Sequence, residues 1–170
     1  MKRLLMFLLI FFGVILQTTL LSFFNIRGVT PNIVILLLII FSLNSDFLTS
    51  MTLGIFAGIL TDFLMLNTIG INILSYFIIV YICNLLRNEM DLDKKIVYVA
   101  TVIVATLIYH GITLFIMFFL GYDVSNFYYI AEKIIIQSIM NVLLFFCINK
   151  FVLFIFRVFN VKFKENINEI

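Results

Sequence analysis

One acidic side chain stands alone within a long apolar run, in the stretch GIFAGILTDFLMLNTIG. Gly54, Gly58 and Asp62 follow one another at four-residue steps, so they share one face of a helix. The glycines are predicted to let another helix approach closely. The next helix is predicted to start near Gly70, where free backbone N–H groups face the same side as the acid. Asp62 is therefore predicted either to tie these two helices together or to hold a ligand or partner protein.

A second polar position opens the stretch VTPNIVILL. Thr30 is predicted as the N-cap of a helix and Pro31 as its first helical residue. Asn32 is less expected there, because an apolar residue would suit the entry to a membrane helix better. The predicted topology puts Asn32 on the same side as Asp62 and Gly70. We therefore expect these three residues to shape an outer surface.

Further polar residues form stripes at helical spacing within apolar segments. The stripes comprise Gly13 with Gln17, then Thr106, His110 and Thr113, and finally Lys133, Gln137 and Asn141. Polar side chains within membrane spans normally face other helices, so we expect inward-facing seams. His110 is the only histidine. A proton relay through it is the less favoured interpretation, because its own helix contains no acid.

The composition indicates an integral membrane protein. Of the 170 residues, 64% are hydrophobic and 12% are charged, whereas a soluble domain normally has about 25% charged residues. The net charge of +2 leaves no basic tract of the kind that binds nucleic acid. The two cysteines, Cys83 and Cys147, lie in apolar segments without CxxC spacing. Both are predicted to be buried thiols that act as small hydrophobic side chains.

The apolar runs predict an all-α fold in a single membrane domain, residues 1–170, with six transmembrane helices. A crossing needs about 20 residues, and the polar cluster near residue 45 divides an apolar stretch too long for one span. The predicted spans are 4–24, 31–43, 48–65, 71–86, 96–120 and 134–156. A re-entrant hairpin over 31–65 is the alternative for the short pair.

The basic residues predict an N-in/C-in topology, with an uncleaved N-terminal anchor. Six crossings place most basic residues on the inner side, namely Lys2, Arg3, Arg87, Lys94, Lys95, Lys150, Arg157, Lys162 and Lys164. Only Arg27 and Lys133 then lie outside. Five crossings would move Arg87 and its neighbours to the side opposite the N-terminus, against the positive-inside rule.

The sequence offers little for catalysis. It contains no HExxH, GxSxG or P-loop motif, and Asp62 is the one acid within a predicted span. A lipid phosphotransferase would need several carboxylates to hold a divalent metal and phosphates. We therefore expect no enzyme, no metal and no cofactor.

Residues 30–81 strongly resemble the rod shape-determining MreD family. The features that carry this resemblance are Pro31 followed by Asn, the glycine and aspartate face that ends at Asp62, and the pair that Ile69 forms with Gly70. Gln17 and Asn141 also match polar positions associated with the family. Ile69 stands where leucine is usual, which is a conservative change.

The resemblance implies a non-enzymatic membrane scaffold of the bacterial cell-elongation complex. It implies binding to MreC, association with MreB, RodA and a penicillin-binding transpeptidase, and a place in the cytoplasmic membrane among its lipids. It also implies a fold like the substrate-binding S components of energy-coupling-factor vitamin transporters, so such an S component is the alternative function. S components typically carry an Ala-x-x-x-Ala pair in the first helix, and residues 4–24 contain no alanine.

Overall fold

A computed structural model describes residues 1–19, 25–65, 70–89, 95–122 and 126–161. Parts of three predictions lie outside the described residues. These are the end of the first span (20–24), Ile69, and the basic residues Lys94, Lys162 and Lys164.

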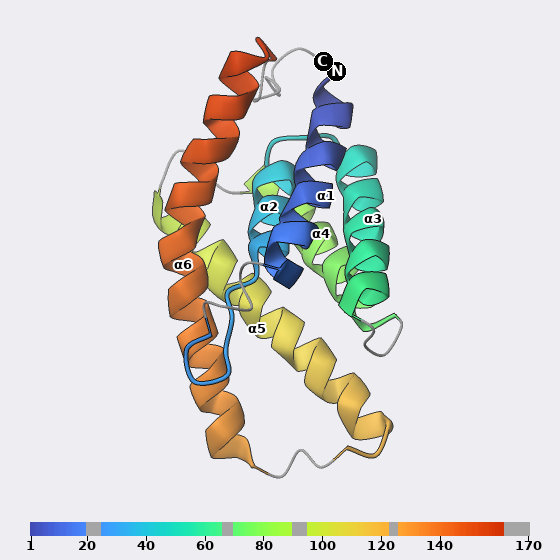
Figure 1. Cartoon of the computed structure of the whole chain (residues 1–170), viewed down its shortest axis with the longest axis vertical. Coiled ribbons are helices and arrows are strands. Elements are labelled where there is room, and N and C mark those ends of the chain that lie inside the picture. The colour runs from blue at the N-terminus through green and yellow to red at the C-terminus, as the bar shows by residue number, and fades with distance from the viewer. Residues whose placement is uncertain (20–24, 66–69, 90–94, 123–125, 162–170) are drawn as a thin grey trace.

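The described residues form six helices joined by turns and loops, with one isolated β-bridge between Ile26 and Val29. Figure 1 shows them in chain order: α1 (Lys2–Thr19), α2 (Ile33–Ser42), α3 (Phe47–Met65), α4 (Ile71–Glu89), α5 (Lys95–Phe119) and α6 (Phe127–Val158). The prediction of an all-α chain with six helices is therefore confirmed for the described residues. The largest departure is α6, which begins well before the span predicted at 134–156.

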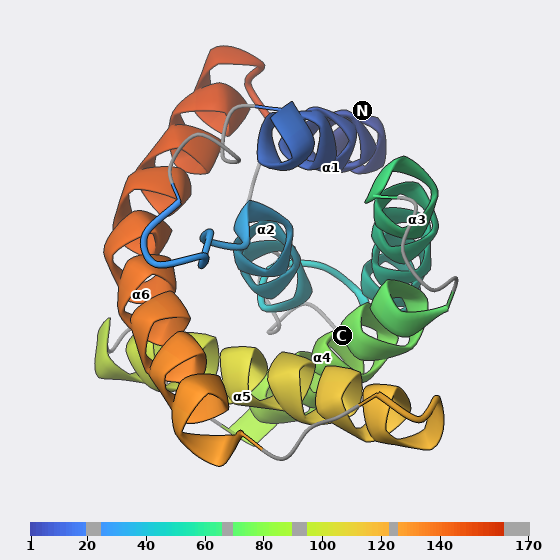
Figure 2. The ribbon, with the colours of Figure 1, turned by 60° about the horizontal axis from the view of Figure 1, so that its bottom comes forward.

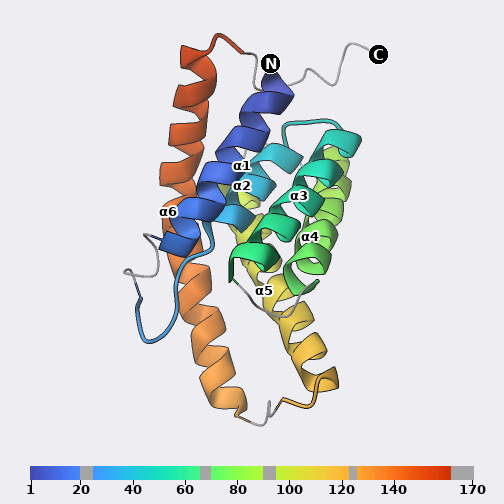
Figure 3. The same cartoon turned by 45° about the vertical axis from the view of Figure 1, so that its right-hand side comes forward.

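Four of the described helices, α1, α3, α5 and α6, contain a segment long and apolar enough to cross a membrane. The start of α1 and the end of α6 lie at the same end of the bundle, as an even number of crossings requires (Figures 1 and 3). The limits of each crossing and the N-in/C-in orientation remain predictions.

The short helix α2 lies at the centre of the bundle, surrounded by the other helices (Figure 2). It contacts every other helix of the described chain. Its 10 residues make it about 15 Å long, half the thickness of a membrane core. A helix that is apolar on all sides lies either in lipid or in a protein core, and here every residue from Val34 to Ser42 is buried within the bundle.

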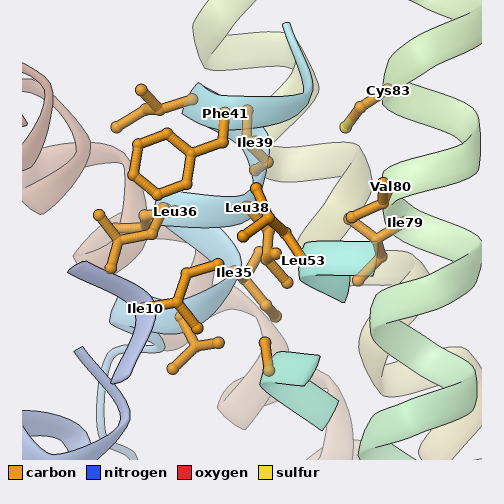
Figure 4. Packing of buried hydrophobic residues seen from close by; sticks show 14 of the residues in the cluster. Ile10, Ile35, Leu36, Leu38, Ile39, Phe41, Leu53, Ile79, Val80 and Cys83 are labelled. Atoms are coloured by element: carbon orange, nitrogen blue, oxygen red, sulfur yellow. The ribbon is translucent and has the colours of Figure 1, made fainter. Parts of the chain in front are cut away.

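The hydrophobic core is built around α2. Figure 4 shows its side chains packed between Ile10 of α1 on one side and Ile79 and Val80 of α4 on the other. Ile35 and Leu38 of α2 are at most 1% exposed. The interior of the bundle is therefore filled by protein side chains along most of α2.

The glycine face of α3 lies against α4. A Cβ atom at Gly58 would clash with the Cα atom of Ile73, and one at Gly54 would stand 3.1 Å from a methyl carbon of Val80. The contact at Gly58 is with backbone, which cannot move aside as a flexible side chain can. The two glycines thus allow the close approach of α3 and α4.

The two cysteines differ in environment. Cys83 of α4 is buried, at 2% exposed, as predicted. Cys147 is exposed on α6, so the prediction of a buried thiol is wrong there. Helix α6 is apolar on several faces, because its outer face meets the surroundings of the bundle. Hydrophobicity alone therefore does not distinguish its outward-facing residues from its buried ones.

Candidate functional site

The buried carboxylate of Asp62 caps the N-terminus of α4. Its oxygens accept hydrogen bonds from the backbone N–H groups of Gly70 at 2.8 Å and Asn72 at 3.1 Å, with a longer contact to Ile73 at 3.4 Å. The side-chain amide of Asn72 donates a further bond at 2.8 Å. Asp62 is only 3% exposed. The positive end of the α4 dipole and these donors together offset the cost of burying the charge.

Asn72 connects this cluster of hydrogen bonds to α5. Its side-chain oxygen accepts a hydrogen bond from the hydroxyl of Tyr109 at 2.9 Å. The ring of Tyr109 stacks on the ring of Tyr76, with centroids 6.0 Å apart. The hydroxyl of Tyr76 in turn accepts a bond from the amide of Asn32 at 3.4 Å. Contacts through Asn72 and the two tyrosines therefore connect Asp62 to the start of the central helix.

The start of α2 differs from the sequence prediction. Asn32 is the N-cap, and its side-chain oxygen accepts a hydrogen bond from the backbone N–H of Ile35 at 3.0 Å. The prediction that Thr30 caps the helix and that Pro31 is its first residue is wrong, because Ile33 is the first helical residue. Asparagine is among the best N-caps, which accounts for a polar residue at this position.

Side chains from α1 and α6 satisfy other free N–H groups at this buried helix start. The side-chain oxygen of Asn141 accepts a bond from the backbone N–H of Asn32 at 2.9 Å. Gln17 accepts one from Val34 at 3.1 Å. Asn141 also donates to the hydroxyl of Thr106 on α5 at 3.0 Å. Helices α1 and α6 are thus bonded directly to the N-terminus of α2, and α5 is connected to it through Asn141.

A further polar contact lies beside this cluster. The side-chain amide of Gln137 donates to the backbone oxygen of Thr30 at 2.8 Å, and its oxygen lies 2.5 Å from Nε2 of His110. His110 is only partly buried. The group it contacts is an amide, which does not ionise, so this contact alone gives no proton-transfer route. Lys133, from the same predicted stripe, lies over the ring of Tyr129 instead.

These positions correct the expectation of an outer surface. Asn32 and Asp62 are each 3% exposed, so both lie inside the bundle. Gly70 is partly exposed and adopts a positive φ of 104°, a conformation suited to glycine as the chain enters α4. The sequence prediction treated the three residues as a shared surface because it could not show that α2 begins inside the bundle.

The turn between α2 and α3 carries a second set of polar contacts. The guanidinium of Arg3 lies 3.6 Å from the carboxylate of Asp46, and Arg87 donates to the backbone oxygen of Ser45. Burial acts to raise the pKa of Asp46, but hydrogen bonds from Thr49 and the charge of Arg3 outweigh it and hold the pKa below its ordinary value. These basic residues, predicted only from topology, also fasten α1 and α4 to this turn.

The polar clusters around Asp62 and Asn32 hold helices together. Throughout the described chain, no buried side-chain nitrogen or oxygen lacks a hydrogen-bond partner. The described residues contain no group of three or more His, Cys, Asp or Glu side chains that could hold a metal ion. Tyr76 and Tyr109 were missed by the sequence reasoning, and their hydroxyl groups within apolar helices were the available signal. The polar groups of the interior bind one another and fix the helices in place.

The comparisons with known proteins give one match. A family model described as rod shape-determining protein MreD matches residues 1–155 of the 170-residue chain. No curated protein matches. No solved structure matches.

Proposed function

We propose, since the chain belongs to the MreD family, that it is a membrane scaffold that binds MreC within the bacterial cell-elongation complex. The family has a role in rod shape determination and is not a known enzyme family. The match over residues 1–155 is the observation that carries the proposal, because it includes all six described helices up to the last turn of α6.

The internal polar contacts support a scaffold rather than a turnover site. Asp62, Asn32 and Asn141 each bind backbone N–H groups at the start of a helix, and their hydrogen-bonding groups are occupied within the bundle. A scaffold requires fixed helix faces, since partners recognise a shape by differential binding. The polar interior would supply that rigidity, while the outward faces of the helices would bind other proteins.

The proposed partners follow from the family. MreC is the direct one, and MreB, RodA and a penicillin-binding transpeptidase would join through the assembled complex. The proposed location is the bacterial cytoplasmic membrane, where the chain crosses several times. The alternative of a vitamin-transporter S component gains no support from the match and is not proposed.

A binary binding experiment tests the proposed contact with MreC. The tagged chain and MreC would be expressed together in a host that lacks the other elongation proteins, then purified in mild detergent. We expect MreC to be recovered with the tagged chain in near-constant ratio. A version of MreC with its transmembrane segment replaced by an unrelated one is the control. No recovery of MreC, with both proteins folded and present in the membrane, would contradict direct binding.

Depletion of the chain in its own host tests the wider role. Rod-shaped cells should become round as the protein is diluted by growth. Re-expression of the parent sequence should restore rods. Cells that remain rods at fully depleted levels would contradict a role in shape for this chain.

A further inference from the structure

An apolar groove lies between α5 and α6 on their outward faces. Its volume is about 410 Å³, and its walls include Val99, Ile103 and Leu107 of α5 and Ile135, Ile139 and Leu143 of α6. Ser138 is the one polar residue of the lining. Ile139 and Leu143 are 56% and 68% exposed, so the groove is open to the surroundings of the bundle.

A second hollow adjoins this groove at the end where α6 begins. It has a volume of about 310 Å³ and is lined by Arg27, Tyr128 and Glu132 together with apolar residues. Ile135 lines both hollows. The two hollows therefore adjoin at Ile135 on α6, and together we call them the depression, whose larger part is apolar and whose smaller part carries the charged residues.

The charged end is a defined ion pair. Arg27 lies in a tight turn closed by two hydrogen bonds between Ile26 and Val29, with a positive φ of 52° at Arg27 and 80° at Gly28. This turn brings the guanidinium to 2.5 Å from the carboxylate of Glu132. The Arg27 side chain is 76% exposed and that of Glu132 is 31% exposed. A guanidinium has five donors and a carboxylate about four acceptor sites, so the pair has capacity for both an anionic and a cationic group.

The length of the depression indicates what fits it. From Glu132 to Leu143 the helix rises about 16 Å, close to half of a membrane core of about 30 Å. Helix α6 has no charged residue between Lys133 and Lys150. The groove lies along the part of this uncharged stretch that is nearer the ion pair. An acyl chain of one leaflet fits the observed length.

We propose that this depression binds a phospholipid with an ethanolamine headgroup. The acyl chain lies in the groove between α5 and α6, the phosphate contacts Arg27, and the ammonium contacts Glu132. Lipid tails are as apolar as the groove walls, so the acyl chain alone gives little preference for one lipid over another. The selectivity comes from the ion pair, which matches a headgroup that carries both charges and N–H donors. The proposal does not rest on MreC binding.

Native mass spectrometry of the purified chain tests the headgroup preference. The protein in detergent would be mixed with equal amounts of phosphatidylethanolamine, phosphatidylcholine and phosphatidylglycerol of matched acyl chains. We expect phosphatidylethanolamine to be retained about two- to fivefold more than phosphatidylcholine, the range typical of an exposed ion pair. The Glu132→Gln variant should retain phosphatidylethanolamine and phosphatidylcholine equally. Equal retention of all three lipids by the parent, or a preference for phosphatidylglycerol, would overturn the proposal.

A pair of matched variants tests the groove. Ile139→Trp fills the groove and should lower the retention of phosphatidylethanolamine about two- to fivefold, the whole preference given by the ion pair, because a displaced acyl chain cannot hold the headgroup there. Ile59→Trp is the control, since Ile59 is a comparably exposed isoleucine of α3, at 51%. Equal losses in both variants would show general contact with lipid and overturn the proposal. Photo-cross-linking from position 139 in native membranes to a protein rather than a lipid would also overturn it.

Discussion

Replacement of Asp62 by alanine should loosen the junction between α3 and α4. The substitution removes the acceptor for the backbone N–H groups of Gly70 and Asn72 and for the side chain of Asn72. These donors lie at a buried helix start, and Asn72 is only 3% exposed. Water therefore has little access to replace the lost bonds.

The expected loss of stability follows from those contacts. Loss of a helix N-cap costs about 0.5–2 kcal/mol, and loss of a hydrogen bond to a charged group costs about 1.5–3 kcal/mol. Together they give a decrease of about 3 kcal/mol in the free energy of unfolding. In a chain of this size that corresponds to a fall of about 6–12 °C in the melting midpoint.

The buried thiol of Cys83 provides the assay. It lies on α4, the helix that Asp62 caps, and is 2% exposed. A thiol-reactive fluorescent dye would label it only as the bundle opens on heating. Cys147 is exposed and would react early, so the measurement uses a Cys147→Ala background.

The Asp62→Asn substitution is the matched control. Asparagine keeps one acceptor oxygen and replaces the other with an NH₂ group, which cannot accept a hydrogen bond. It therefore loses the bonds made to one carboxylate oxygen, either those from Gly70 and Ile73 or those from Asn72, together with the interaction of the charge with the helix dipole, about 0.3–1 kcal/mol. We expect its midpoint to lie between those of the parent and of Asp62→Ala. An alanine variant as stable as the parent would refute the capping role, and an asparagine variant as stable as the parent would refute a contribution from the second carboxylate oxygen.

Three further changes test other contacts. The first two use the same assay, and the pH dependence is followed by circular dichroism, because the dye reacts with the thiolate and so does not react below about pH 4. Gly58→Ala places a Cβ atom against the backbone of α4 and should lower the free energy of unfolding by about 1–3 kcal/mol. The control is Gly111→Ala, whose Cβ atom meets open space and should change stability little. Equal effects would contradict the close approach of α3 and α4. Asn141→Leu removes the acceptor for the backbone N–H of Asn32 and should cost about 1–3 kcal/mol, and a variant of parental stability would show that this bond contributes nothing. The pKa of Asp46 is lowered in the folded state, so its contribution is complete above about pH 4 and is lost as the pH falls through the folded pKa. The stability of the parent should therefore fall more steeply below pH 4 than that of Asp46→Asn, and parallel curves would contradict this.

The contact of Asp62 with α4 could be predicted from the sequence. A lone acid at the end of one apolar helix and a glycine at the start of the next leave few other partners on that side. The structure places Gly70 and Asn72 against Asp62, at the helix start that the topology indicated. The close approach at Gly58 follows from its position one turn before the acid.

The position of α2 could not be predicted. Its sequence is apolar on all sides, so its periodicity does not distinguish a helix that enters from the membrane surface from one that starts inside the bundle. The N-cap depends on Gln17 and Asn141, which are distant in sequence from Asn32 and reach it only in the folded chain. Thr30 and Pro31 fit the local pattern for a helix start, but the tertiary contacts favour a start at Ile33.

A scaffold assembles proteins, whereas a transporter component binds a solute. The most direct measurement is a mild-detergent pull-down of the tagged chain from native membranes, with the recovered proteins quantified by mass spectrometry. We predict recovery of MreC together with RodA and a penicillin-binding transpeptidase, well above an untagged control. Recovery of paired ATPase subunits with a transmembrane coupling protein, and without MreC, would contradict the account.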